Sequence, residues 1–255
     1  MFPRDTVRTA LQQDQFRLVY QPIVMLNTGG VVGFEALARW AHPTRGEVPP
    51  SVFIAAFERT GAIAAFGEWV VRRAMTEAAV WHRRARELNQ PLYLSVNVSG
   101  YELQQFAYSE AVVTICVDCQ YRCQDLRVEV IESYFDLDRQ EVRANLETLR
   151  RKEVFVMVDD YGTGASDVHR LIELAADAIK LDISMIADIE TNADRRRYLE
   201  KLSAIARRAD LEVVVEGIER ESQLAILLAL GYQLGQGFLF SPAVPASEVG
   251  TLLHH

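Results

Sequence analysis

Short apolar runs in this chain end repeatedly on an acidic, amide or lysine side chain, and this pattern constrains the fold more than any other feature. Strands rich in valine and isoleucine that stop on an acid are typical of a (β/α)8 barrel, whose active-site residues lie at the carboxyl ends of the strands. The segments are VVGFEAL, LYLSVNV, LRVEVIE, VFVMVDD, AIKLD and VVVEGIE. In this order, their polar residues are Glu35, Asn97, Glu129 with Glu132, Asp159 with Asp160, Lys180 with Asp182, and Glu216 with Glu219.

If these strands close one barrel, their ends meet at a single mouth. Roughly eight carboxylates then lie within reach of one another. Like charges packed so closely cannot all stay ionised unless cations compensate them. The pattern therefore predicts bound metal at the mouth of the barrel.

Length and composition fit one barrel of enzyme size. The chain has 255 residues, of which 49% are hydrophobic, enough for a large core, and we expect residues 1–255 to form a single domain. The net charge of -8 argues against binding to nucleic acid polymers or to an anionic membrane surface, because both need a basic face. Neither a leader-like segment nor a membrane-spanning apolar run is visible, which predicts a cytoplasmic protein.

Strand and helix patterns alternate along most of the chain, as an α/β barrel requires. With a strand ending near Gln21 and a last one near Gln236, the pattern gives eight strands. Only residues 27–30 join the first two strands, too few for a helical crossover, so these two are expected to be antiparallel. The segment ARWAHPTRGEVPP after Glu35 is interpreted as a long loop. Helices are predicted at residues 6–13, 52–60 with Ser51 as the cap, 62–88, 108–118, 138–151, 166–174, 194–209 and 220–230.

The candidate ligands at the predicted mouth all offer oxygen. They are Glu35, Asn97, Glu129, Asp159, Asp160 and Glu216. Oxygen-only sites suit Mg2+ or Mn2+, whereas a zinc site is expected to include His or Cys. The set exceeds what one Mg2+ needs, so two metals fit better. A two-metal site is well matched to phosphodiester hydrolysis, in which both ions brace an in-line displacement.

Lys180 is the basic residue among these acids. It could position a nucleophilic water or neutralise charge in the transition state, and an internal salt bridge is the structural alternative. An enolase-type barrel, in which a lysine at a strand end removes a proton next to a carboxylate, would also place Lys180 there. That class leaves the additional acids and Arg39 without a role.

At these residues the chain resembles the EAL domain, the cyclic di-GMP phosphodiesterase module of bacterial signalling. The resemblance covers about residues 13–249. It rests on the blocks QPIV, FEALARW, SVNVS, VEVIES, VDDYGTG, DAIKLD, VEGIE and QGFLF. The fold that it implies is a modified TIM (β/α)8 barrel with the first two strands antiparallel, in agreement with the short first connection.

The resemblance also implies roles for individual residues. Glu35, Asn97, Glu129 and Asp159 would hold one metal, and Asp159 with Asp160 would reach the second. Lys180 and Glu216 would order and activate the bridging water in a reaction that yields linear pGpG. Contacts to the dinucleotide are implied for Gln21, Leu37, Arg39, Asp182, Glu219 and Gln236, with Arg39 on a phosphate, while Glu132 would brace the loop after Asp160.

Two features of the sequence depart from the family pattern. The loop from Tyr161 to Asp167 reads YGTGASD where FGTGYSS is usual, and Ile183 and Met185 stand where Arg and Phe are common. The altered loop leaves open a second class of function, a catalytically inactive receptor for cyclic di-GMP. The family commonly dimerises next to this loop, so a homodimer is expected. We expect Ca2+ to bind the same oxygen ligands but to inhibit hydrolysis, because its bonds are longer and its coordination is looser.

Overall fold

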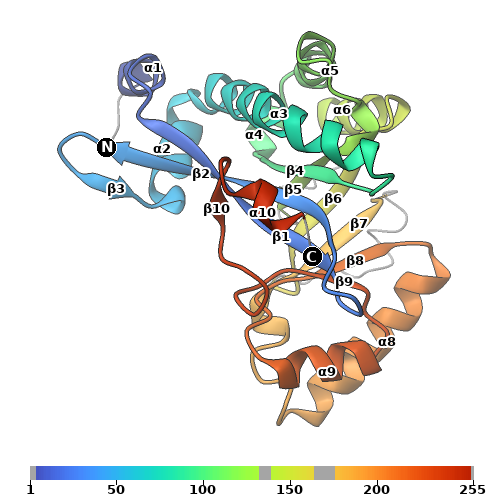
Figure 1. Cartoon of the computed structure of the whole chain (residues 1–255). Helices are drawn as coiled ribbons and strands as arrows, with labels where there is room; N and C mark the ends of the chain where they lie inside the picture. Colours follow the sequence, from blue (N-terminus) through green and yellow to red (C-terminus); the bar gives the residue numbers. More distant parts are fainter. Residues whose placement is uncertain (1–3, 132–138, 164–175, 254–255) are drawn as a thin grey trace.

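The computed structural model of the chain describes residues 4–131, 139–163 and 176–253. Within them, one ten-stranded sheet contains eight strands that close into a ring in the order β1-β9-β8-β7-β6-β5-β4-β2 and back to β1. The prediction of a modified (β/α)8 barrel is therefore confirmed (Figure 1). The strands of the ring are β1 (Phe16–Met25), β2 (Val31–His42), β4 (Tyr93–Val98), β5 (Leu126–Ile131), β6 (Phe155–Tyr161), β7 (Ala178–Leu181), β8 (Glu212–Val215) and β9 (Leu234–Gly235).

Strand β1 runs against the direction of the other strands in the ring. It pairs antiparallel with both β2 and β9, whereas the remaining neighbours in the ring pair parallel. A tight turn makes this possible, because the N–H of Gly29 donates to the Met25 carbonyl over 2.8 Å and Gly29 adopts a left-handed φ of 73°. The predicted antiparallel start is confirmed.

The segment after Glu35 differs from the expected loop. Strand β2 continues to His42 and turns back into β3 (Gly46–Val48), so Glu35 lies inside a strand rather than at its end. Pro43, which suggested a loop, lies in the turn between β2 and β3, and Gly46 begins β3. Phe16 on β1 and Trp40 on β2 pack against Phe53, with ring centroids 5.1 to 5.9 Å apart, and so join these strands to the helix that follows.

Helices follow the strands and cover the outside of the barrel. In Figure 1, α3, α5 and α6 lie on one side of it and α8 and α9 on the opposite side. The helix expected at residues 166–174 lies outside the described residues. Among the described helices, none is both long and apolar enough to cross a membrane. The helices are α1 (Arg4–Gln12), α2 (Pro50–Thr60), α3 (Ile63–Glu87), α4 (Gly100–Leu103), α5 (Tyr108–Asp118), α6 (Gln140–Arg151), α8 (Ala193–Arg208), α9 (Glu221–Ala229) and α10 (Val249–Leu252).

Side chains that alternate along the strands fill the barrel in layers. A middle layer is apolar and buried, and it separates two polar ends. The amino-terminal end holds Arg127 and Glu212, and the carboxyl-terminal end holds Lys180 among acids. The middle layer consists of Ile23, Tyr93, Met157, Ala178, Val214 and Leu234.

Candidate active site

Four carboxylates surround the ammonium group of Lys180, those of Glu35 on β2, Glu129 on β5, Asp159 on β6 and Glu216 directly after β8. Nζ lies 2.6 Å from Glu216 Oε1, 2.7 Å from Glu129 Oε2, 3.0 Å from Glu35 Oε2 and 3.5 Å from Asp159 Oδ1. The Lys180 side chain is 1% exposed, so these contacts are made out of water. The structure thus brings the strand-end acids together as the sequence pattern predicts, with Lys180 at their centre.

Amide side chains fix the positions of two of these acids. Asn97 Nδ2 donates to Glu35 Oε1 over 2.7 Å, and Gln236 Nε2 donates to Glu35 Oε2 over 2.8 Å. The same Gln236 nitrogen lies 3.1 Å from Glu216 Oε1. Glu35 and Glu216 are therefore held in one hydrogen-bonded unit with Lys180. A residue predicted to contact substrate, Gln236, also orients the acids.

Burial and neighbouring charges shift the acid–base equilibria of the cluster in opposite directions. Burial raises the pKa of Glu129 well above its usual range, and the charge of Glu35 raises it further. Burial also acts on Glu35, but Lys180 and the amide hydrogen bonds outweigh it and hold the Glu35 pKa below its usual value. Burial alone would lower the pKa of Lys180. The surrounding carboxylates, of which Glu129 contributes most, raise this pKa well above its usual value. Lys180 therefore stays protonated, and its single positive charge cannot neutralise four carboxyl groups.

Ser95 is a polar group of the site that the sequence interpretation missed. Its Oγ donates a short hydrogen bond to Glu129 Oε1, and the residue is fully buried. Ser95 lies two positions before Asn97 on β4, so both side chains point to the same face of the strand. This alternation is the signal that could have identified it.

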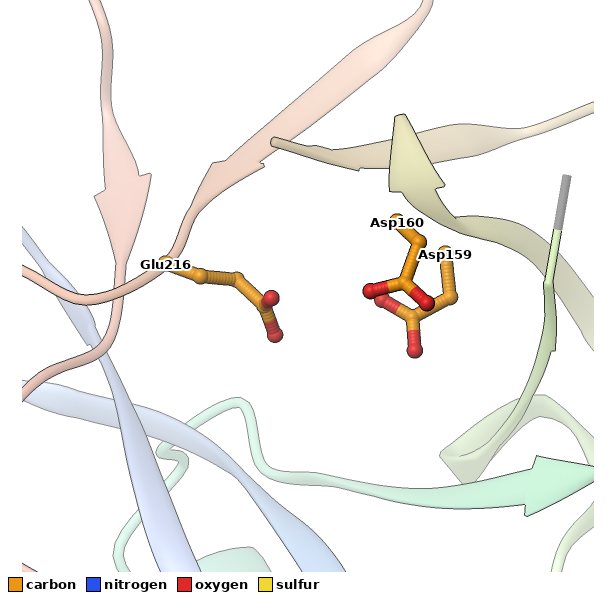
Figure 2. Close-up of side chains that lie close together, drawn as sticks. All are labelled: Asp159, Asp160 and Glu216. Carbon is orange, nitrogen blue, oxygen red and sulfur yellow. The ribbon is translucent and has the colours of Figure 1, made fainter. Parts of the chain in front are cut away.

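Asp159 and Asp160 both face the mouth although they are consecutive in the chain. Neighbours in a regular strand point to opposite faces, but the pairing of β6 with β7 shifts register between Val158 and Tyr161, and Asp160 has a φ of 57°. This irregularity turns both carboxylates inward, where they face Glu216 from across the mouth (Figure 2). Oxygens of these three acids lie within 4.8 Å of one another.

This trio fits a hard divalent cation. Its donors are all carboxylate oxygens, the type that Mg2+ and Mn2+ prefer. Asp159 Oδ1 is buried and accepts no hydrogen bond within the described residues, so it keeps a lone pair for a ligand. Burial and then the charge of Asp159 raise the pKa of Asp160, and burial raises the pKa of Glu216 to about 7. A cation placed here would relieve both of these penalties.

The remaining residues of the predicted metal set contact Lys180 or Glu35. Glu35, Asn97 and Glu129 are linked to Lys180 directly or through a hydrogen bond. Asp159 and Glu216 contact Lys180 and also belong to the trio with Asp160. The predicted ligands thus form two groups that share two acids, and Lys180 already occupies the space between the carboxylates of the first group.

The predicted substrate-binding residues flank the acids on two sides. Leu37 and Arg39 follow Glu35 along β2 and line a cavity of about 350 Å³ with Asn97. Gln21, Glu219 and Gln236 line a smaller one of about 220 Å³ beside Glu216. Asp182 follows β7, and its Oδ1 accepts a hydrogen bond of 2.9 Å from the Ser184 N–H. Glu132 lies outside the described residues.

The positions that depart from the family pattern pack beside the mouth. Ile183 lies over Gly217, where an added Cβ would come within 2.3 Å of the isoleucine Cγ1, and Met185 covers Gly162 in the same way. Tyr161 bonds through its hydroxyl to Tyr198 on α8 over 3.2 Å. Residues 164–167 of the altered loop lie outside the described part of the chain.

Fold and site together define a class of protein, an eight-stranded barrel with a reversed first strand and with a buried lysine ringed by acids at its mouth. Comparison with known proteins places the chain within that class. The EAL domain family profile matches residues 4–243. The chain belongs to the EAL domain family.

The relatives of the chain include an uncharacterized protein and a cyclic di-GMP phosphodiesterase. An uncharacterized protein of Sinorhizobium fredii is 37% identical over 97% of this chain and 29% of its own length. A cyclic di-GMP phosphodiesterase of Pseudomonas aeruginosa is 34% identical over 94% of this chain and 41% of its own length. The solved structure of the PaMucR phosphodiesterase in complex with cyclic di-GMP has a TM-score of 0.88, is 31% identical, and is covered over 98% of its chain and 96% of this one. The chain spans less than half the length of these two curated relatives.

Proposed function

We propose that this chain hydrolyses cyclic di-GMP to linear pGpG with the help of Mg2+ or Mn2+. The observation that carries the proposal is the convergence of Asp159, Asp160 and Glu216 beside Lys180, in a family whose members include cyclic di-GMP phosphodiesterases. This arrangement pairs an acidic cation site with a buried ammonium group. Hydrolysis of a phosphodiester needs a site that deprotonates the attacking water and a positive charge that stabilises the negative charge of the transition state.

The divalent ions, when bound to the acid trio, would offset its negative charge and make a nearby water more acidic. Glu216, which belongs to the trio and lies 2.6 Å from Lys180 Nζ, would be placed to take a proton from this water. Lys180 would donate a hydrogen bond to a phosphate oxygen as charge grows on it. The water oxygen forms a bond to phosphorus, the bond from phosphorus to the 3′ oxygen breaks, and that oxygen takes up a proton.

A receptor that binds cyclic di-GMP without cleaving it is the alternative. It is favoured by one observation, the altered sequence from Tyr161 to Asp167 directly after the paired aspartates. All the acids of the cluster and Lys180 are nevertheless present and in contact, which supports the enzyme. The homodimer and the cytoplasmic location stay predictions.

One metal exchange experiment separates the enzyme from the receptor. Purified protein is mixed with cyclic di-GMP in Ca2+, Mg2+ or Mn2+, binding is measured by calorimetry and product by chromatography. We expect binding in all three ions and pGpG in Mg2+ or Mn2+ alone, because Ca2+ coordinates at roughly 2.3 to 2.6 Å rather than about 2.0 to 2.1 Å and holds its ligands more loosely. Tight binding with no product in any ion would establish the receptor.

A further inference from the structure

The turn that follows the paired aspartates is strained at Asp160. Asp160 has a left-handed φ of 57°, and Gly162, two residues later, has a φ of 107°. A residue other than glycine persists in this region only where the surrounding structure holds it. The cation site depends on this conformation, because it directs the Asp160 carboxylate toward Asp159 and Glu216 (Figure 2). Other parts of the fold must therefore hold Asp160 in place before a cation binds.

The backbone of the turn sets the position of the Asp160 carboxylate. Among the described residues, none donates a hydrogen bond to this carboxylate or forms a salt bridge with it. The nearby charge of Asp159 repels it. The Asp160 carbonyl, by contrast, accepts hydrogen bonds of 3.3 and 2.9 Å from the N–H and hydroxyl groups of Thr163. Contacts that hold the turn therefore also hold the carboxylate.

The side chain of Tyr161 anchors this turn to α8. Tyr161 is 2% exposed, and its hydroxyl is hydrogen-bonded to the hydroxyl of Tyr198 on α8 over 3.2 Å. Its backbone belongs to the sheet, because its carbonyl accepts a hydrogen bond of 3.2 Å from the Asp182 N–H. Phenylalanine, which is usual in the family at this position, could not form the bond to Tyr198. The link to α8 therefore depends on the tyrosine of this sequence.

A second contact from α8 reaches the same turn. Arg195 Nη1 donates to Met185 Sδ over 3.4 Å. Met185 packs on Gly162, where an added Cβ would come within 2.4 Å of the same sulfur. Arg195 and Tyr198 are three residues apart in the helix, so they project from one face of it. This face of α8 thus holds the two residues that follow Asp160.

We propose that Tyr198 is a positioning residue, which holds Asp160 in the cation site through its hydrogen bond to the Tyr161 hydroxyl. This inference rests on the proposed function and gives α8 a part in metal binding. Because the bond fixes the strained conformation before the cation binds, the cation need not supply the free energy to reach it. Loss of the bond should therefore weaken metal binding although every carboxylate is still present.

Two conservative substitutions test this inference from the two ends of the bond. Tyr198→Phe and Tyr161→Phe each remove one hydroxyl group and keep the ring that packs. Because both variants break the same bond, the double variant should lose no more metal affinity than either single variant. Tyr232→Phe is the matched control. The Tyr232 hydroxyl donates to the Leu199 carbonyl on α8 over 2.8 Å, so this variant removes a bond to the same helix that does not lead to Asp160.

The affinity for Mn2+, measured by calorimetry without substrate, is the readout, and thermal unfolding of the metal-free proteins reports stability. We expect the two test variants and the double variant to bind Mn2+ roughly 3- to 10-fold more weakly, the range that the loss of one hydrogen bond allows. The control should unfold at a lower temperature and keep the wild-type affinity.

Three results would overturn the inference. They are unchanged Mn2+ affinity in both test variants, an equal loss of affinity in the control, and losses that add in the double variant, which would show that the two hydroxyl groups act separately. Wild-type protein that binds no Mn2+ would instead refute the cation site of the proposed function.

Discussion

The two ends of the barrel each hold a basic side chain, Lys180 buried and Arg127 13% exposed, and they differ in how its charge is balanced. At the amino-terminal end Arg127 pairs with one carboxylate, that of Glu212, and its Cζ lies 3.4 Å from the centroid of the Tyr93 ring and 4.3 Å from that of Phe155. At the other end Lys180 meets four carboxylates. The apolar middle layer keeps the two groups apart.

This difference separates a structural ion pair from a functional site. Arg127 and Glu212 neutralise each other, and stacking on two rings suits the planar guanidinium group. The Lys180 cluster keeps excess negative charge, which can be balanced by protons or by metal. A cavity of about 570 Å³ lies at the Arg127 end and exceeds the two cavities beside the acids, of about 350 and 220 Å³, so cavity size alone would have indicated the wrong end. Charge balance is the more informative quantity.

Glu35→Ala should have the largest effect, because it removes an acid that contacts Lys180 and two amides at once. We expect turnover of cyclic di-GMP to fall by roughly 10³-fold or more, in the range seen when a reacting constellation is broken. Turnover is measured by chromatography and Mn2+ binding by calorimetry. Glu200→Ala, on the exposed face of α8, serves as the control. More than a few per cent of wild-type turnover with metal still bound would exclude Glu35 from the site.

Lys180→Ala should lower kcat by roughly 10²-fold or more while the protein still binds Mn2+. The reason is that the acids remain and their mutual repulsion, no longer offset by the ammonium group, favours a cation. Lys152→Ala, at an exposed position, is the matched control. An unchanged kcat would reduce Lys180 to a structural partner like Arg127, and the contrast between the two ends would disappear.

Arg127→Met should lower stability and spare catalysis. It leaves Glu212 without its partner, which we expect to cost about 2–3 kcal/mol in the free energy of unfolding, less than for a fully buried pair because Glu212 is 31% exposed. Urea titration measures the loss, and kcat of the folded fraction should stay within about twofold. Adding Glu212→Gln to Arg127→Met should recover part of the stability. A large fall in kcat would show that the two ends communicate through the middle layer.

The Lys180 end of the barrel could be predicted from the sequence, because strands that end on acids predict both the barrel and the meeting of these acids at one mouth. Lys180 and the acids around it were identified in this way. The inward turn of Asp160 could not be predicted, since it depends on a register shift between β6 and β7. The partnership of Arg127 with Glu212 could not be predicted either, since it depends on pairing across the barrel.

Tyr93→Phe should have the smallest effect and tests the same contrast with one hydroxyl group. Tyr93 is buried at the Arg127 end, and its hydroxyl has no hydrogen-bond partner within the described residues. Its removal should therefore leave the free energy of unfolding unchanged or raise it by up to about 1 kcal/mol, because a buried polar group without a partner is unfavourable.

The matched variant at the catalytic end is Ser95→Ala, whose hydroxyl donates to Glu129. It should cost about 1–3 kcal/mol, because it leaves a buried Glu129 oxygen without its donor, and it should also lower kcat because Glu129 contacts Lys180. Thermal unfolding and turnover of both variants provide the comparison. If Tyr93→Phe instead destabilised the protein as much as Ser95→Ala, the Tyr93 hydroxyl would have a partner, and the Arg127 end would hold a polar network of its own.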